Sequence, residues 1–153
     1  MKLFPWQKKK PFFNEEEQAL LLDAIRVAER RTSGEVRLFV ESHCRFMDPM
    51  DRAREIFAQL RMMETKDRNA TLIYLAVKDH QVAVMGDTGI HEKVGQHYWE
   101  EEVNKMLLEF RAEHLAEGLR QCILDIGEAL HKHFPYDKET DKNELPDEII
   151  FGR

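Results

Sequence analysis

Oxygen-bearing side chains gather in three short segments that lie far apart in the sequence, at residues 32–35, 67–69 and 86–89. Their carboxylate, amide and hydroxyl oxygens are ligands that a hard cation such as Ca²⁺ accepts, in sets of about six to eight, whereas zinc prefers nitrogen and sulfur. If the segments meet in space, they form a site for Ca²⁺, Mg²⁺ or another divalent cation. The candidate ligands are Glu35, Asp67, Asn69, Asp87 and Thr88, and the other residues around the ion would be Thr32, Ser33, Arg68, Gly86 and Gly89.

Two other uses of these segments are compatible with the sequence. In the first, Glu35 forms an ion pair with Arg68, and residues 86–89 are only a tight connection, since glycine permits backbone shapes that other residues resist. In the second, the turn cradles a phosphate at a helix N-terminus. However, neither GxxxxGK[ST] nor GxGxxG occurs, and Asp87 and Glu92 would repel an anion. No fixed-spacing calcium loop occurs either, so the cation site is a hypothesis about geometry.

An apolar run at the centre of the chain predicts the strand around which the fold is built. Residues 70–77 (ATLIYLAV) are apolar on both alternating sides, which indicates a strand covered on both faces. Residues 81–85 return as an antiparallel hairpin partner, and residues 35–41 have the periodicity of a strand. A helix starting at Asp48 and Pro49 connects 35–41 to 70–77, and such a crossover is almost always parallel. The three oxygen-rich segments then meet at one edge of the sheet.

The remaining helices give an α/β chain with the element order α-β-α-β-β-α-α. The first helix starts at Asn14, where Glu17 completes a capping-box pattern. A long helix begins near Ile90, and a last helix ends near His133. We expect the acidic, proline-containing tail from Tyr136 to be extended or mobile. The predicted organisation is an aromatic and basic N-terminal arm over 1–13, a folded domain over 14–134 and an acidic tail over 135–153.

A second polar group is expected at the opposite edge of the sheet. Its members are Glu41, His43, Cys44, Asp48, Asp51, Asp79 and His80. Cys44 beside a histidine is either an activated thiolate or an exposed thiol without a role. On the helix after the hairpin, Tyr98, Trp99 and Met106 are expected in the core, and the acidic run 100–102 is expected on a solvated face.

Composition argues against several classes of function. The 153 residues carry a net charge of −6, whereas a general nucleic-acid binder needs a basic face. No segment approaches the roughly 20 apolar residues of a membrane span, and no secretory signal is recognisable. Cys44 and Cys122 are too few for a disulfide framework or a zinc cluster. We therefore expect a cytoplasmic protein in which the N-terminal aromatic residues, including Phe12 and Phe13, fold back onto the domain.

Four stretches of the sequence occur in an order that is typical of a known family. They are TSGEVRLFV at 32–40, RNATLIYLAV at 68–77, QVAVMGDTGI at 81–90 and FRAEHLAEGLRQCILDIGEAL at 110–130. Together they resemble the TPM domain, a module of thylakoid-lumen photosystem repair proteins and of many membrane-anchored bacterial proteins. The similarity runs from about Phe12 to Phe134, and the tail NELPDEIIFG is similar to that of small cytoplasmic bacterial members.

The resemblance implies a three-layer α/β/α sandwich, here with a small mixed sheet, together with binding of a divalent metal, often calcium, and a proposed weak acid phosphatase activity. Three of the family's motifs fall on 32–35, 68–69 and 86–89, which the strand order already brings to one edge. The sequence differs from the usual pattern in two respects. No signal peptide or membrane anchor is recognisable, and the turn GDTG has one residue more than is usual.

Two classes of function are therefore open. The first is a cytoplasmic module that holds a calcium-type cation and contacts another protein. The second is an enzyme in which the same metal positions a phosphomonoester for hydrolysis, as Lewis acid and water activator. The first is favoured because phosphoryl transfer relies on positioned positive charge, and Arg68 is the only cation expected beside the site.

Overall fold

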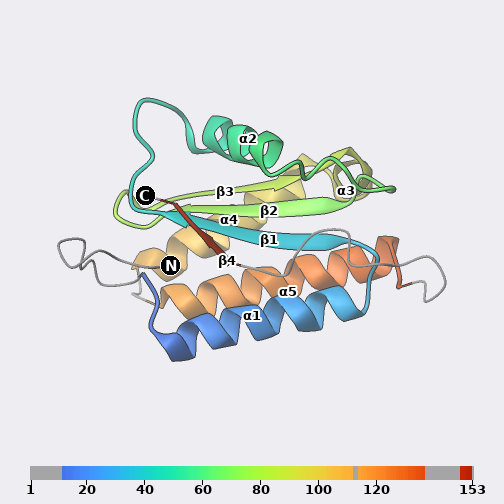
Figure 1. Ribbon diagram of the computed structural model, residues 1–153, viewed down its shortest axis with the longest axis horizontal. Coiled ribbons are helices and arrows are strands. Elements are labelled where there is room, and N and C mark those ends of the chain that lie inside the picture. Colours follow the sequence, from blue (N-terminus) through green and yellow to red (C-terminus); the bar gives the residue numbers. More distant parts are fainter. Residues whose placement is uncertain (1–11, 112–113, 137–148, 153) are drawn as a thin grey trace.

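The chain folds into a sheet with helices packed on both faces (Figure 1). The structure is a computed structural model that describes residues 12–111, 114–136 and 149–152. Its helices are α1 (Glu15–Arg30), α2 (Pro49–Gln59), α3 (Thr88–Val94), α4 (Gln96–Arg111) and α5 (Leu115–His133), and its strands are β1 (Glu35–Glu41), β2 (Ala70–Ala76), β3 (Gln81–Gly86) and β4 (Ile149–Phe151). Helices α1, α4 and α5 pack on one face and α2 on the other, which confirms the three-layer α/β/α sandwich.

Two helices begin where their capping residues predict. At the start of α1, the Asn14 side chain accepts from the Glu17 amide at 2.8 Å, and the Glu17 side chain accepts from the Asn14 amide at 3.1 Å, which is a complete capping box. Asp48 caps α2 by accepting from the Met50 amide at 2.9 Å. Pro49 occupies the first turn of α2, where a missing N–H is harmless.

The sheet has the strand order β3-β2-β1-β4. As predicted, β1 and β2 are parallel and are joined through α2, while β2 and β3 form an antiparallel hairpin. Glu35 lies opposite Ala70, and Thr71 lies opposite Gly86. The start of β1, the start of β2 and the end of β3 therefore share one edge of the sheet.

Alternation along the strands divides the core into two layers. On one face, Leu38 and Ile73 pack with apolar residues of α1, α4 and α5. On the other face, Leu72 and Tyr74 pack with apolar residues of α2. Every residue of β2 is buried. The prediction of a central strand covered on both faces is confirmed.

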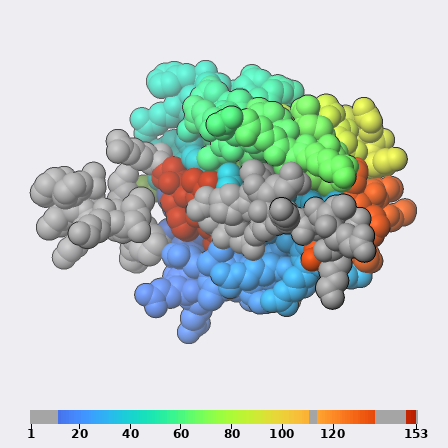
Figure 2. Space-filling model, turned by 45° about the vertical axis from the view of Figure 1, so that its right-hand side comes forward, coloured from blue at the N-terminus to red at the C-terminus, as the bar shows by residue number. Residues whose placement is uncertain are grey.

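Two elements differ from the prediction. The long helix expected from Ile90 onward is divided into α3 and α4, because Gly95 adopts a φ of 80°, a conformation that ends the helix and that glycine tolerates best. In the tail, Ile149–Phe151 form β4, which pairs in parallel with Leu38, Phe39 and Val40. Strand β4 reaches the surface (red in Figure 2) and makes β1 an interior strand of the sheet.

The first described residues pack onto the domain. Phe13 is buried, and the Phe12 ring stacks on Phe151 with the ring centroids 6.2 Å apart, as expected for these two aromatic residues. The rest of the predicted N-terminal arm, residues 1–11, and the part of the predicted tail between 137 and 148 fall outside the described residues, and the predicted domain boundaries stay predictions. Within the described ranges, no helix combines the length and the apolarity needed to cross a membrane.

Candidate functional site

The three oxygen-rich segments lie together at one edge of the sheet. The side-chain amide of Asn69 donates to the Ser33 hydroxyl at 3.1 Å, which joins the start of β2 to the start of β1. The Gly89 amide donates to the Arg68 carbonyl at 2.8 Å, which brings the turn after β3 to the same place. We name the segments 32–35, 67–69 and 86–89 the crossing-loop rim.

The loop before β2 and the loop after β3 cross at Gly89. A Cβ atom at this position would lie 2.0 Å from the carbonyl oxygen of Asp67 and 2.6 Å from that of Arg68. Only glycine permits such a close approach without movement of the backbone. The glycine in this turn is therefore required by packing between two loops that are about twenty residues apart in sequence.

Asp87 is the buried carboxylate at the end of β3, with 3% of its surface exposed. It caps α3 by accepting from the Thr88 amide at 2.7 Å. Arg68 Nε donates to Asp87 Oδ2 at 2.6 Å, and Arg68 Nη2 donates to Asp87 Oδ1 at 2.8 Å, so the ion pair is bidentate. The alternative in which Arg68 pairs with Glu35 is therefore wrong.

The two partners of this ion pair differ in their contact with solvent. The Arg68 side chain is 48% exposed, whereas the Asp87 side chain is 3% exposed. Hydrogen bonding to Asp87, together with the charge of that carboxylate, raises the pKa of the Arg68 guanidinium. Arg68 can turn into water without moving the backbone, but Asp87 is fixed at the start of α3.

Glu35 lies at the same level of the sheet as Asp87 but on a different strand. It is opposite Ala70 in β2, and the Asp87 amide donates to the Ala70 carbonyl at 2.9 Å. Because neighbouring strands lie about 4.8 Å apart, the backbones of Glu35 and Asp87 are separated by about 10 Å. Glu35 is also buried. An ion that contacted both carboxylates would lie over the start of β2.

The neutral oxygens of the rim have different surroundings. The Thr32 hydroxyl lies 3.1 Å from the Leu130 carbonyl, contacts the Phe134 carbonyl, and accepts from the Gly34 amide at 3.0 Å. Thr32 therefore connects the end of α5 to the start of β1 through hydrogen bonds. Asn69 is 1% exposed, and its Oδ1 atom has no hydrogen-bond partner among the described residues.

The chemistry of the crossing-loop rim is that of oxygen ligands. Asp67 and Thr88 are exposed, and the Oδ1 atom of Asn69 is a buried acceptor. In the part of the chain that the structure describes, no three His, Cys, Asp or Glu side chains are grouped so as to hold a metal ion. A cation at this rim would depend on one or two carboxylates together with neutral oxygens and water, which suits calcium or magnesium rather than zinc.

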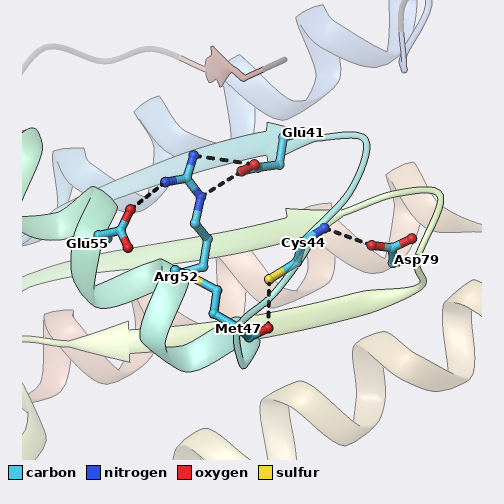
Figure 3. A network of polar contacts seen from close by, with 6 residues as sticks. All are labelled: Glu41, Cys44, Met47, Arg52, Glu55 and Asp79. Atoms are coloured by element: carbon cyan, nitrogen blue, oxygen red, sulfur yellow. Dashed lines mark hydrogen bonds and ion pairs between the residues drawn. The ribbon is translucent and has the colours of Figure 1, made fainter.

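At the opposite edge of the sheet, Asp79 organises the loop that follows β1 (Figure 3). Asp79 Oδ1 lies 2.8 Å from His43 Nδ1, and Oδ2 accepts from the Cys44 amide at 2.8 Å. These two hydrogen bonds lower the pKa of Asp79. The Cys44 thiol is directed to the Met47 carbonyl at 3.4 Å. His43 is hydrogen-bonded to Asp79, and the Cys44 thiol is hydrogen-bonded to the loop backbone. This geometry favours a structural role for Cys44 over an activated thiolate.

Sequence reasoning does not single out Arg52, which organises the other half of this edge (Figure 3). Its guanidinium donates to Glu41 at 3.0 and 3.4 Å and to Glu55 at 2.9 Å. It also lies 5.9 Å from the centre of the Phe39 ring. A hollow of about 430 Å³ borders these residues, but Glu41 and Arg52 neutralise each other there. The sequence signal for this ion pair is weak. A strand ends in an acidic residue, Glu41, and the next helix has a basic residue, Arg52, one turn after its start.

Glu102 is a buried acidic residue within a run of three acidic residues. The acidic run 100–102 is expected on a solvated face, and this is wrong for Glu102, which is 2% exposed, while Glu100 and Glu101 are exposed. Trp99 and Met106 are buried, as predicted. Glu102 is three residues after Trp99 and four before Met106, so helical spacing places all three on one face. That spacing is the signal that identifies its inward direction.

Comparison with known proteins identifies the family. The family model described as the TPM domain matches residues 8–129. The chain belongs to the TPM domain family. The match spans the whole crossing-loop rim, and it confirms the resemblance carried by the four sequence stretches.

Solved structures share this TPM fold. The NMR structure of the BA42 protein from the psychrophilic bacterium Bizionia argentinensis is 39% identical, with a TM-score of 0.85 over 95% of this chain and 99% of that chain. The N-terminal domain of a P. gingivalis protein is 15% identical, with a TM-score of 0.68 over 82% of each chain. That of the cg2496 protein from Corynebacterium glutamicum is 12% identical, with a TM-score of 0.57 over 78% of this chain and 74% of that chain. At such low identity, the last two show the fold alone.

Proposed function

We propose that this TPM domain binds a calcium-type divalent cation at the crossing-loop rim and acts as a protein-interaction module. The observation that carries the proposal is the asymmetric ion pair of Asp87 and Arg68. The Asp87 side chain is 3% exposed, and the Arg68 side chain that balances its charge is 48% exposed. The buried anion is fixed and its counterion is exchangeable, so a divalent ion from solvent can take the place of the guanidinium.

The oxygen-bearing groups of the crossing-loop rim are suitable ligands for a hard cation. The Asp87 carboxylate would supply the charge, and Asn69 would supply Oδ1, which has no hydrogen-bond partner among the described residues. Asp67 and Thr88 would add oxygens from the exposed side of the rim, and Glu35 would approach from the far side of β2. Since Ca²⁺ takes about six to eight oxygens, water would complete its coordination shell.

Ion binding would change the surface of the domain as well as its charge. When a cation displaces Arg68 from Asp87, the guanidinium turns toward solvent. A free guanidinium is a good donor to the carboxylate of another protein, because its planar geometry allows two parallel hydrogen bonds. The rim would then be a contact surface that depends on the cation, and for this reason we propose another protein as the partner.

Hydrolysis of phosphomonoesters is less well supported for the same rim. The matching family model carries the word phosphatase in its name. Phosphoryl transfer requires several positive groups around the transferred oxygens, but the Arg68 guanidinium is bonded to Asp87. The carboxylates of Glu35 and Asp87 would also repel a phosphate group.

Calorimetric titration with CaCl₂ tests the proposal through two variants of opposite effect. Asp87→Asn keeps a cap for α3 but removes the charge, so Ca²⁺ should bind at least about tenfold more weakly. Arg68→Ala removes the internal competitor, so Ca²⁺ should bind roughly tenfold more tightly. The size of the two changes distinguishes exchange with Arg68 from general attraction of Ca²⁺ to an acidic protein. Each substitution removes a single charge, so it would alter such general attraction only slightly.

Asp79→Asn is the matched control, because it removes a hydrogen-bonded carboxylate at the opposite edge of the sheet. Its Ca²⁺ affinity should equal that of the wild type. Equal affinities for the wild type, Asp87→Asn and Asp79→Asn would refute a cation site at the rim. Hydrolysis of p-nitrophenyl phosphate in the presence of Ca²⁺ or Mg²⁺, lost in Asp87→Asn and kept in Asp79→Asn, would favour the enzyme instead.

A further inference from the structure

Helices α4 and α5 border a hollow of about 290 Å³ that lies away from the crossing-loop rim. Its wall is mostly acidic, with Glu102 and Glu109 from α4 and Glu117 and Asp125 from α5, and Lys105 is the basic residue of the wall. A water molecule takes up about 30 Å³ of liquid volume. The hollow therefore has a negative wall and room for a guest of several non-hydrogen atoms.

Glu102 is the buried carboxyl group of this wall. Its side chain is 2% exposed, and its Oε2 atom has no hydrogen-bond partner in the described part of the chain. Its Oε1 atom lies 3.5 Å from Lys105 Nζ, beyond the distance of about 2.7–2.9 Å that is typical of a charge-assisted hydrogen bond. A buried carboxyl oxygen without a donor is destabilising, and the residue that carries it is part of the wall of the hollow.

Asp125 is the second carboxylate of the hollow, and it too is only loosely neutralised. Its Oδ1 atom accepts from Gln121 Nε2 at 2.8 Å, and its Oδ2 atom lies 3.4 Å from Lys105 Nζ. Lys105 is thus near both carboxyl groups without close contact to either, and its side chain is 61% exposed. Burial, followed by the charge of Asp125, raises the pKa of Glu102 to about 7. The negative charge of the hollow is therefore only partly balanced.

We propose that this hollow binds an organic cation of the alkylammonium or guanidinium class, with its charged group beside Glu102 and Asp125. The Lys105 ammonium is a group of this class beside the same two carboxylates, and because it is mostly exposed it can leave the position. A metal ion fits less well, since the described residues contain no group of three His, Cys, Asp or Glu side chains arranged to hold one. The site is separate from the crossing-loop rim and goes beyond the function proposed there.

The cation can come from a free amine or from a Lys or Arg side chain of another protein, and amide NMR distinguishes the two sources. The probes are 1,4-diaminobutane and the peptide acetyl-Gly-Arg-Gly-amide, at pH 8, above the pKa of Glu102. We expect saturable shifts of the Glu102, Cys122 and Asp125 amides beyond those caused by NaCl at equal ionic strength. Saturation by the diamine identifies a free amine, and saturation by the peptide alone identifies a side chain; either result supports the site.

Two variants and a matched control sharpen this experiment. Lys105→Met removes the internal competitor and should tighten binding roughly tenfold, whereas Glu102→Gln keeps the shape and should weaken it at least about tenfold. Glu100→Gln, on the exposed side of α4, should bind like the wild type.

Two results would overturn the proposal. One is the lack of saturable shifts in both the wild type and Lys105→Met. The other is a set of shifts around Glu102 that CaCl₂ or MgCl₂ causes and neither organic cation does. Calcium binding at the crossing-loop rim is unaffected by either outcome, so the two proposals fail independently.

Discussion

Asp87 and Glu102 are both buried carboxyl groups with a basic residue nearby, but their surroundings differ. Asp87 accepts two hydrogen bonds from Arg68, at 2.6 and 2.8 Å, and one from the Thr88 amide at 2.7 Å. Glu102 has Lys105 at 3.5 Å and an Oε2 atom without a partner among the described residues. Burial raises the pKa of Glu102 to about 7. One acid is well compensated within the fold, and the other is not.

The difference follows from the element that carries each group. Asp87 precedes α3, where free backbone N–H groups and the helix dipole favour a negative charge. Glu102 lies inside α4, where the backbone amides are used by the helix, so only side chains can neutralise it. Position in the helix thus decides whether the backbone helps to stabilise a buried acid or leaves this to side chains alone.

The largest loss of stability in this comparison is expected for Asp87→Ala. The substitution removes an N-cap worth about 1 kcal/mol and hydrogen bonds to a charged group worth about 2 kcal/mol, so the free energy of unfolding should fall by about 3 kcal/mol. Urea denaturation in the absence of divalent cations measures this fall in the free energy of unfolding. Asp67→Ala, at an exposed position of the same rim, should change stability by less than about 0.5 kcal/mol. Equal losses in the two variants would contradict the account of Asp87.

A smaller effect, which depends on pH, is expected for Glu102→Gln. Glu102 has a pKa of about 7 in the folded chain against an ordinary value of 4.5. Between these two values the folded state holds a proton that the unfolded state has released, so wild-type stability falls as the pH rises through this window. The variant does not titrate at this position. It should exceed the wild type by on the order of 2 kcal/mol at pH 8, and the difference should shrink toward pH 5.

Denaturant unfolding at several pH values between 5 and 8 checks this prediction. Glu101→Gln, at the exposed neighbouring position, serves as the control and should follow the wild-type profile. Parallel profiles for the wild type and Glu102→Gln would mean that Glu102 does not carry the predicted pKa.

The smallest effect is expected for Lys105→Met. Lys105 is 61% exposed and lies 3.4 Å or more from both carboxyl groups, so its ion pairs are screened by water. Stability at pH 7 should change by less than about 1 kcal/mol, as thermal unfolding will show. A loss as large as that of Asp87→Ala would mean that Lys105 neutralises Glu102 as firmly as Arg68 neutralises Asp87.

Much of the fold is predictable from the sequence because its signals are local or periodic. The apolar run of β2 identifies the central strand, and the capping residues Asn14 and Asp48 locate the starts of α1 and α2. The parallel crossover then brings the segments of the crossing-loop rim to one edge. The close approach at Gly89 is not among these predictions and is seen only in the structure.

The remaining features depend on contacts that no local pattern records. Strand β4 has three residues and pairs with β1, which lies more than a hundred residues earlier in the sequence. The residues next to β4 in the sequence therefore do not predict this pairing. The choice of Asp87 over Glu35 as the partner of Arg68 depends on the side-chain geometry of the crossing loops. Glu102 is different, because its spacing from Trp99 and Met106 is a local signal; that signal is obscured by the exposed acids Glu100 and Glu101 beside it.

The central claim is that a divalent cation replaces Arg68 at Asp87, and the Arg68 Nε–H resonance reports this exchange directly. Without the ion, the signal should have the shift and slow solvent exchange of a group bonded to a carboxylate. As CaCl₂ is added, it should move in a saturable manner to the position of a free, rapidly exchanging arginine. An unchanged Arg68 signal at Ca²⁺ concentrations that saturate the calorimetric titration would contradict the claim.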